Sequence, residues 1–123
     1  MSLDAASEIA SKLKSDKELN TLVEGGIHRG IASDSTKYPR IIFLELKNAE
    51  DNFYDNEAQG SEVRYQFSVF CNSSTVSKEK LIVKALNKCI KELGYVRYDS
   101  QDLPEIEEKI YHKALRYRKS FFN

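Results

Sequence analysis

The sequence predicts an α+β fold, an antiparallel β-sheet with two helical segments packed on it, in the order α-β-β-α-β-β. One strand is indicated by apolar residues that alternate with polar ones over residues 62–71. One amphipathic helix is indicated by apolar residues at helical spacing over residues 81–93, with lysines between them. The chain has 123 residues without an internal repeat or linker, so we expect a single domain over residues 1–123.

The N-terminal segment is predicted to be helical, because apolar residues recur at helical spacing from Ala6 to Leu13. Asp4 is the expected N-cap. Ser15 and Glu18 have the spacing of a capping box, which predicts that the helix restarts there. Two glycines at 25–26 are expected to end the segment, since glycine readily adopts the left-handed conformation of a helix C-cap.

Two long strands are expected to form a hairpin. The first covers residues 40–46 and begins after Pro39, which lacks the N–H needed for a ladder hydrogen bond. The second is the alternating segment that ends at Cys71. Between them, residues 48–60 are acidic, rich in asparagine and end at glycine, so we expect a mobile loop. Residues 27–31 are compatible with a very short additional strand, outside this order.

The second helix is expected to follow capping side chains at residues 72–75 and to end before Gly94. Its predicted apolar stripe consists of Leu81, Ala85, Leu86, Cys89, Ile90 and Leu93. Residues 95–98 are predicted to form a strand and residues 99–104 a turn. For the last segment, residues 106–121, the periodicity suits a helix and a strand about equally well.

The residues that carry most enzyme chemistry are few and scattered. Cys71 and Cys89 lie in core-like segments, where thiols act as small, inert hydrophobic groups. His28 and His112 lack partners at metal-ligand spacing, so surface or interface histidines are the preferred interpretation. The sequence contains no glycine-rich phosphate loop in a strand–loop–helix context. We therefore predict that the protein is not an enzyme and has no metal or cofactor site.

Overall charge and hydropathy argue against two classes of partner. The sequence has 19 basic and 19 acidic residues, whereas a dedicated nucleic-acid-binding protein needs a basic excess to neutralise phosphates. The sequence has no apolar run near the roughly 20 residues of a membrane span, so no membrane contact is expected.

The charges are nevertheless segregated along the chain. Six acidic residues lie from Glu45 to Glu62, and five basic residues lie from Lys109 to Lys119. Opposite patches suit head-to-tail association of subunits, while two solvated faces without a role are the equally weighted alternative. Aromatic residues beside the acidic charges favour the interface. The predicted interface residues are Asp51, Phe53, Tyr54, Asp55, Lys113 and Arg116.

Five sequence blocks follow one another along the chain: Tyr38-Pro39-Arg40-Ile41-Ile42-Phe43, Asp51-Asn52-Phe53-Tyr54-Asp55-Asn56, Tyr65-Gln66-Phe67-Ser68-Val69-Phe70, Leu93-Gly94-Tyr95-Val96-Arg97 and Ile110-Tyr111-His112-Lys113-Ala114-Leu115-Arg116-Tyr117. In this order and spacing they resemble the tail completion, or tail-to-head joining, proteins of long-tailed phages and Gram-positive prophages, which are related in shape to tail terminators. The resemblance runs from about Leu19 to Tyr117.

This resemblance implies a subunit that forms a ring, expected to be a hexamer, which caps the tail tube and meets the head connector. It implies a strand around residues 111–113, no cofactor and no catalysis. It also implies assembly in the bacterial host cytoplasm and a final place at the head–tail junction of the virion. In such a ring, Arg116 and Arg118 are candidates to face the channel and to contact DNA transiently and without sequence preference.

Two other interpretations remain open. One is a head-side connector or stopper subunit. The other is a small nucleic-acid-binding module, in which Tyr111 and Tyr117 act as stacking platforms beside the C-terminal basic residues.

Overall fold

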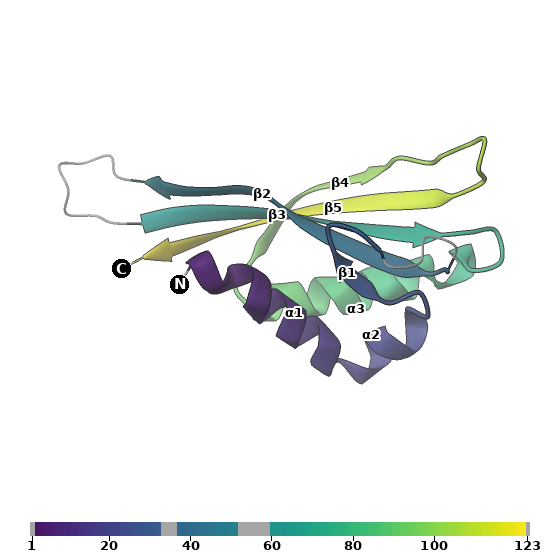
Figure 1. Cartoon of the computed structure of the whole chain (residues 1–123), viewed down its shortest axis with the longest axis horizontal. Helices are drawn as coiled ribbons and strands as arrows, with labels where there is room; N and C mark the ends of the chain where they lie inside the picture. Colours follow the sequence, from purple (N-terminus) through teal and green to yellow (C-terminus); the bar gives the residue numbers. More distant parts are fainter. Residues whose placement is uncertain (1, 33–36, 52–59, 123) are drawn as a thin grey trace.

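A computed structural model of the chain describes residues 2–32, 37–51 and 60–122. Within these residues, five strands form one sheet, and the helices lie under one of its faces (Figure 1). The fold therefore has the predicted α+β class. The strands are β1 (Ile27–Arg29), β2 (Arg40–Asp51), β3 (Gly60–Cys71), β4 (Val96–Asp102) and β5 (Tyr111–Phe122). The helices are α1 (Ala5–Ser15), α2 (Lys17–Leu22) and α3 (Glu79–Glu92), with 3-10 turns η1 (Ser2–Asp4) and η2 (Val76–Lys78).

The sheet has the strand order β1-β2-β3-β5-β4. Strand β1 runs parallel to β2, with Ile27 in register with Ile41, and the other pairs are antiparallel. The sheet is therefore mixed rather than antiparallel, and the predicted order of elements lacked β1. The very short strand with which residues 27–31 were compatible is present at Ile27–Arg29. Three residues show no periodicity, so its place in the sheet and its parallel direction follow from its pairing alone.

The backbone before β1 is hydrogen-bonded to the start of β2. The N–H of Gly25 donates to the carbonyl of Pro39 (2.7 Å), and the N–H of Ile41 donates to the carbonyl of Gly26 (3.0 Å). A Cβ atom on Gly25 would lie 2.5 Å from the carbonyl oxygen of Lys37, so this close approach requires glycine. The glycine pair therefore follows the helical segment, as predicted, and also seats β1 beside β2.

The N-terminal helical segment is divided into α1 and α2 at Asp16, next to the predicted restart. Asp16 caps α2, because its Oδ1 accepts the N–H of Leu19 at 2.9 Å. The hydroxyl of Ser15, the predicted cap, instead donates to the carbonyl of Lys12. Asp4 occupies the N-cap position of α1 without a side-chain capping bond. The described residues thus hold three α-helices, where two helical segments were predicted.

Helix α3 packs on the sheet through a stripe that differs from the predicted one at its start. Ile82 is fully buried, whereas Leu81 is 54% exposed. Ile82 lies three to eight residues before the buried pairs at 85–86 and 89–90, which places all of them on one helix face. The predicted capping segment is a separate turn, in which Oδ1 of Asn72 accepts the N–H of Thr75 at 3.0 Å, and η2 lies between it and α3.

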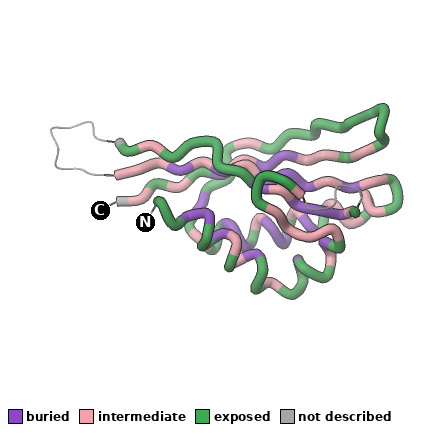
Figure 2. The backbone as a smooth tube through the Cα atoms, viewed as in Figure 1, coloured by how far each residue is buried: buried purple, intermediate pink, exposed green. Residues whose placement is uncertain are grey.

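The core lies between the helices and one side of the sheet (Figure 2). The predicted alternation of β3 is confirmed, because Val63, Tyr65, Phe67, Val69 and Cys71 are all fully buried. Phe67 contacts Tyr117 of β5 edge to face, with 5.6 Å between the ring centroids. The hydroxyl of Tyr117 donates to Oδ1 of Asn87 at 2.6 Å and joins β5 to α3. In the described part of the chain, the opposite face of the sheet carries no helix (Figure 1).

The β2–β3 hairpin is longer than the sequence predicted. Residues 48–51 of the expected loop 48–60 pair with residues 60–63, so both of its ends belong to strands. Its remainder, residues 52–59, lies outside the described residues. Similarly, β4 continues to Asp102, inside the predicted turn. Asparagine and aspartate have low strand propensity, and pairing with neighbouring strands overrides it here.

The C-terminal segment that periodicity left undecided is strand β5. It pairs with β3 along 12 residues and with β4 on its other side. The strand that the family resemblance implied is therefore confirmed.

Candidate assembly interface

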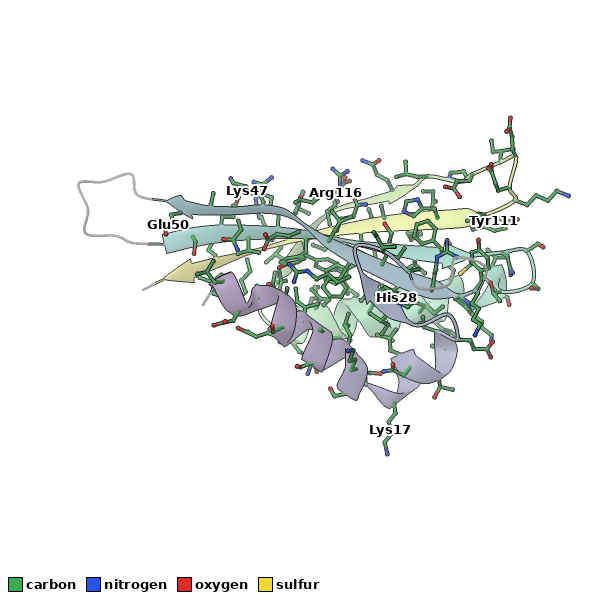
Figure 3. The ribbon with its side chains drawn as sticks, viewed as in Figure 1. Lys17, His28, Lys47, Glu50, Tyr111 and Arg116 are labelled. Atoms are coloured by element: carbon green, nitrogen blue, oxygen red, sulfur yellow. The ribbon has the colours of Figure 1, made fainter. Side chains whose placement is uncertain are left out.

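In the described part of the chain, the face of the sheet opposite the helices is left uncovered by any helix (Figure 1). Figure 3 shows Lys47 and Arg116 projecting from this side, with the helices on the other. The alternation of β5 decides which of its residues take part, since Leu115 and Tyr117 are fully buried while Arg116 and Arg118 lie between them and point the other way. We call this surface the open face.

One end of the open face is organised around Glu62. Its Oε1 accepts hydrogen bonds from Nζ of Lys47 at 3.1 Å and from Nε of Arg64 at 2.9 Å. Both hydrogen bonds hold the pKa of Glu62 below its usual value, and the bond from Lys47 has the larger effect. The guanidinium of Arg64 also lies 5.2 Å from the ring centroid of Tyr98 on β4. Glu62 and Tyr98 therefore keep Arg64 oriented on the surface.

The middle of the open face carries the two arginines of β5. Nε of Arg116 donates to Oε1 of Gln66 at 3.0 Å, and Arg116 is in register with Asp99 of β4. Arg118 is exposed and lies in the row between Arg64 and Val96. Beside these two arginines the face carries basic Lys47 and Arg64 and acidic Glu62 and Asp99, and further along β2 Arg40 lies on the same side, in register with Phe70.

Exposed apolar side chains lie on both sides of these central charges. Leu44 of β2, in register with Gln66, is 37% exposed, and on the edge strand β4 Val96 is 57% exposed and Tyr98 is 36% exposed. A surface that combines exposed apolar side chains with arginine is typical of protein contact sites. The open face can therefore bind a protein surface that is apolar and acidic.

The predicted interface residues do not form one surface. Lys113 is in register with buried Val69 on the helix side of the sheet, and its Nζ lies 3.3 Å from Oδ1 of Asp102. Lys113 and Arg116 therefore lie on opposite faces of β5. Lys119 is also used within the subunit, because its Nζ donates to the carbonyl of Leu93 at 2.6 Å. The basic run of the sequence is divided between the two faces by strand alternation.

The acidic part of the predicted interface is largely beyond the described structure. Asp51 is the last residue of β2 and is in register with Gly60. Phe53, Tyr54 and Asp55 lie outside the described residues.

The aromatic residues proposed as stacking platforms for nucleic acid are not equivalent. Tyr111 is 42% exposed, but Tyr117 is fully buried between the sheet and α3. Because a buried ring cannot stack on a base, the platform interpretation is wrong for Tyr117.

Both cysteines are buried and reduced, as predicted. Burial raises the pKa of the Cys71 thiol to about 11 and that of Cys89 to about 12. The thiol of Cys89 also donates to Oδ2 of Asp16 at 3.2 Å. At neutral pH both groups are therefore protonated thiols, which are poor nucleophiles and poor metal ligands.

The two histidines lie far apart and have different surroundings. Nε2 of His28 is 2.8 Å from the carbonyl oxygen of Gly25. The ring of His112 stacks on Phe70 at 4.3 Å, and burial lowers the pKa of His112. His112 and Glu79 line a surface hollow of about 270 Å³, with Asp102 at its rim. Among residues 2–32, 37–51 and 60–122, no three His, Cys, Asp or Glu side chains gather closely enough to hold a metal ion.

Sequence reasoning missed the tip of the β4–β5 hairpin, residues 103–110, which it divided between the turn at 99–104 and the undecided segment 106–121. Leu103 is 42% exposed and Ile106 is 82% exposed, and Glu105, Glu107 and Glu108 are exposed beside them. A large apolar residue between acidic ones was the available signal, and only the structure shows that it protrudes.

The chain is similar to known proteins in both its sequence and its fold. Residues 7–119 match the family described as tail completion protein gp17. The chain belongs to this family. The family is one of phage structural proteins and not of enzymes. No curated protein matches the sequence significantly.

Two solved structures share the fold of this tail completion family member. A chain in the virion of a native gene transfer agent particle matches with a TM-score of 0.66 and 11% identity, covering 94% of this chain and 92% of that one. The gp17 protein of bacteriophage SPP1 matches with a TM-score of 0.61 and 15% identity, covering 99% of this chain and 89% of that one. At these identities the likeness concerns the fold. None of the helices described here has the length and apolar character needed to cross a membrane.

Proposed function

We propose that this chain is a tail completion subunit whose copies form a ring, expected to be a hexamer, that closes the tail tube and joins it to the head connector. Family membership supports the role. The feature of the fold that supports it best is the open face, where arginines lie between exposed Leu44 on one side and exposed Val96 and Tyr98 on the other. The ring would form in the cytoplasm of the bacterial host and remain at the head–tail junction of the virion.

The open face supports assembly better than turnover. It is a broad sheet surface whose charged groups are oriented by neighbours such as Gln66 and Glu62. Binding sites for small substrates are instead concave and bring a few polar groups together. We also propose that Phe53 and Tyr54, on the acidic segment between β2 and β3, contact a neighbouring subunit or the tail tube.

Deletion of the gene from an inducible prophage tests the proposed role. We expect electron microscopy to show complete heads beside unjoined tails, with infectivity restored by the wild-type gene supplied in trans. Heads that have lost their DNA would instead identify a head-side stopper subunit and contradict the proposal.

A second function for the same residues is favoured by the basic excess of the open face, where Arg118 is exposed. If that face lines the channel, Arg116 and Arg118 contact passing DNA weakly through its phosphates. The double substitution Arg116→Glu and Arg118→Glu separates the two roles. Loss of head–tail joining places these arginines at a protein interface, whereas normal joining with impaired infectivity places them in the channel.

A further inference from the structure

The tip of the β4–β5 hairpin is an ordered turn closed by backbone hydrogen bonds. The N–H of Glu105 donates to the carbonyl of Ile110 at 2.9 Å, and the N–H of Ile110 donates back to the carbonyl of Glu105 at 3.0 Å. The N–H of Leu103 donates to the carbonyl of His112 at 2.8 Å, and the ion pair of Asp102 with Lys113 lies at the base of the tip. The tip is therefore held in one shape before it meets a partner, which lowers the entropic cost of binding.

This tip presents apolar side chains to solvent at its end. Ile106 is 82% exposed and Leu103 is 42% exposed, so neither contributes to the core of its own subunit. Three glutamates and one lysine surround them, all exposed: Glu105, Glu107, Glu108 and Lys109. Such a tip fits a partner surface that carries both basic and exposed apolar side chains.

The open face of the same protein has that character. Arg64, Arg116 and Arg118 lie on its central strands, and exposed Leu44 on β2 and Val96 and Tyr98 on β4 lie on either side of them. A subunit cannot fold its own tip back there, because the tip continues the paired strands β4 and β5 past Asp102, whereas Arg118 pairs with Val96, about 20 Å earlier along β4. The complementary partner is therefore the open face of another copy.

We propose that neighbouring subunits associate head to tail, with the tip of one, centred on Ile106, docked on the open face of the next, centred on Arg116 and Arg118. This inference rests on the proposed ring-forming function and names the contact that forms the ring. A contact between two different surfaces repeats from copy to copy and closes into a ring when the rotation between neighbours divides a full turn. The glutamates of the tip face the arginines of the neighbour, and Ile106 packs against the exposed apolar side chains beside those arginines.

Reciprocal charge reversal tests the contact with the full chain. The tip variant carries Glu105→Lys, Glu107→Lys and Glu108→Lys, and the face variant carries Arg116→Glu and Arg118→Glu. We expect each variant alone to self-associate at least about tenfold more weakly than the wild type, because like charges then meet at every contact. An equimolar mixture should regain association, since each variant complements the other in an alternating assembly.

Sedimentation velocity and amide chemical shifts over a concentration series to about 1 mM measure this association. The matched control is Lys84→Glu with Lys91→Glu on the exposed side of α3, which changes the net charge by the same amount as the face variant and should associate like the wild type. Recovery in the mixture supports the contact even if one variant is somewhat destabilised. Mixed variants that remain monomeric, or a wild type without concentration-dependent shifts in the tip and open face, would overturn it.

The contact and the proposed function fail in different ways. If the tip variant restores infectivity to the deletion prophage as well as the wild type does, the docking inference is wrong while the tail completion role stands. If the wild-type gene itself does not restore head–tail joining, the proposed function is wrong.

Discussion

At the scale of single residues, Asp16 connects the two helical parts of the structure. Its carboxylate caps α2 through the N–H of Leu19 and accepts the thiol of Cys89 on α3. Both hydrogen bonds hold the pKa of Asp16 below its usual value, and the bond from the N–H of Leu19 has the larger effect. One side chain thereby begins a helix and joins it to a neighbour.

We expect Asp16→Ala to lower the free energy of unfolding by about 1 kcal/mol at neutral pH, the usual cost of a lost N-cap. Because the pKa is lower in the folded state, the contribution of the carboxylate is complete above the pKa of the unfolded chain. It disappears as the pH falls through the folded-state pKa. Urea unfolding at a series of pH values should therefore show the difference between variant and wild type shrinking in acid.

Asp4→Ala is the matched control for this capping bond. Asp4 is also an aspartate at an N-cap position, but its side chain makes no capping hydrogen bond. Its replacement should change the free energy of unfolding by no more than about 0.5 kcal/mol. An equal loss in both variants would mean that the carboxylate charge, and not the hydrogen bond to Leu19, supports the helix.

The buried thiols give a second prediction at this scale. Since burial raises the pKa of Cys71 to about 11 and of Cys89 to about 12, almost no thiolate forms near pH 8. A thiol reagent such as DTNB should therefore react with neither cysteine in the native protein and with both after unfolding in guanidinium chloride. Rapid reaction of one thiol in the native state would contradict the described packing.

At the scale of elements, β5 shows how one strand serves two surfaces. Lys119 lies on the helix side, where its Nζ donates to the carbonyl of Leu93 and lies 5.5 Å from the ring centroid of Tyr95. This places a positive charge at the C-terminal end of α3, where free carbonyls favour cations. Arg118, the preceding residue, lies on the open face.

The substitution Lys119→Met should therefore lower the free energy of unfolding by about 1 kcal/mol, because it removes a cation from the carbonyl end of α3. Thermal unfolding followed by circular dichroism should show a fall in Tm of about 4 °C. Arg118→Met, one residue away on the other face, should leave Tm nearly unchanged and weaken self-association instead. Equal falls in Tm would show that the two positions are not separated by the sheet.

At the scale of the whole molecule, the charges of the chain balance in number but are separated in space. Acidic residues gather at the tip of the β4–β5 hairpin, and basic residues gather on the open face. The proposed contact between them combines screened charges with apolar burial, and these two parts respond differently to salt. The assembly, and not the fold, is therefore the property most sensitive to ionic strength.

We expect self-association of the wild type to weaken as sodium chloride is raised from about 50 mM to about 500 mM, because the Debye length shortens. Ile106→Asn should weaken association at every salt concentration and leave its salt dependence in place, since it removes apolar contact and no charge. Its Tm should be unchanged because Ile106 is 82% exposed. Sedimentation velocity across the salt series provides the measurement, and salt-independent association of the wild type would contradict the charge pairing.

The sequence alone determined the features that depend on periodicity over several residues. The core alternation of β3, the amphipathic character of α3 and the buried cysteines follow from which residues avoid water. The order of short sequence blocks also indicated the family and the strand nature of β5, which periodicity left undecided. These features are local, so neighbouring residues suffice to specify them.

Only the tertiary structure decided the features that depend on a distant partner. The parallel pairing of β1, the extension of β2 and β3 into the predicted loop and the choice of Ile82 over Leu81 all follow from what packs or pairs opposite them. The basic run near the C-terminus is one cluster in the sequence, but the sheet sends Lys113 to one face and Arg116 to the other. Side chains that alternate along a strand share a run of sequence without sharing a surface, and which surface is uncovered depends on where the helices pack.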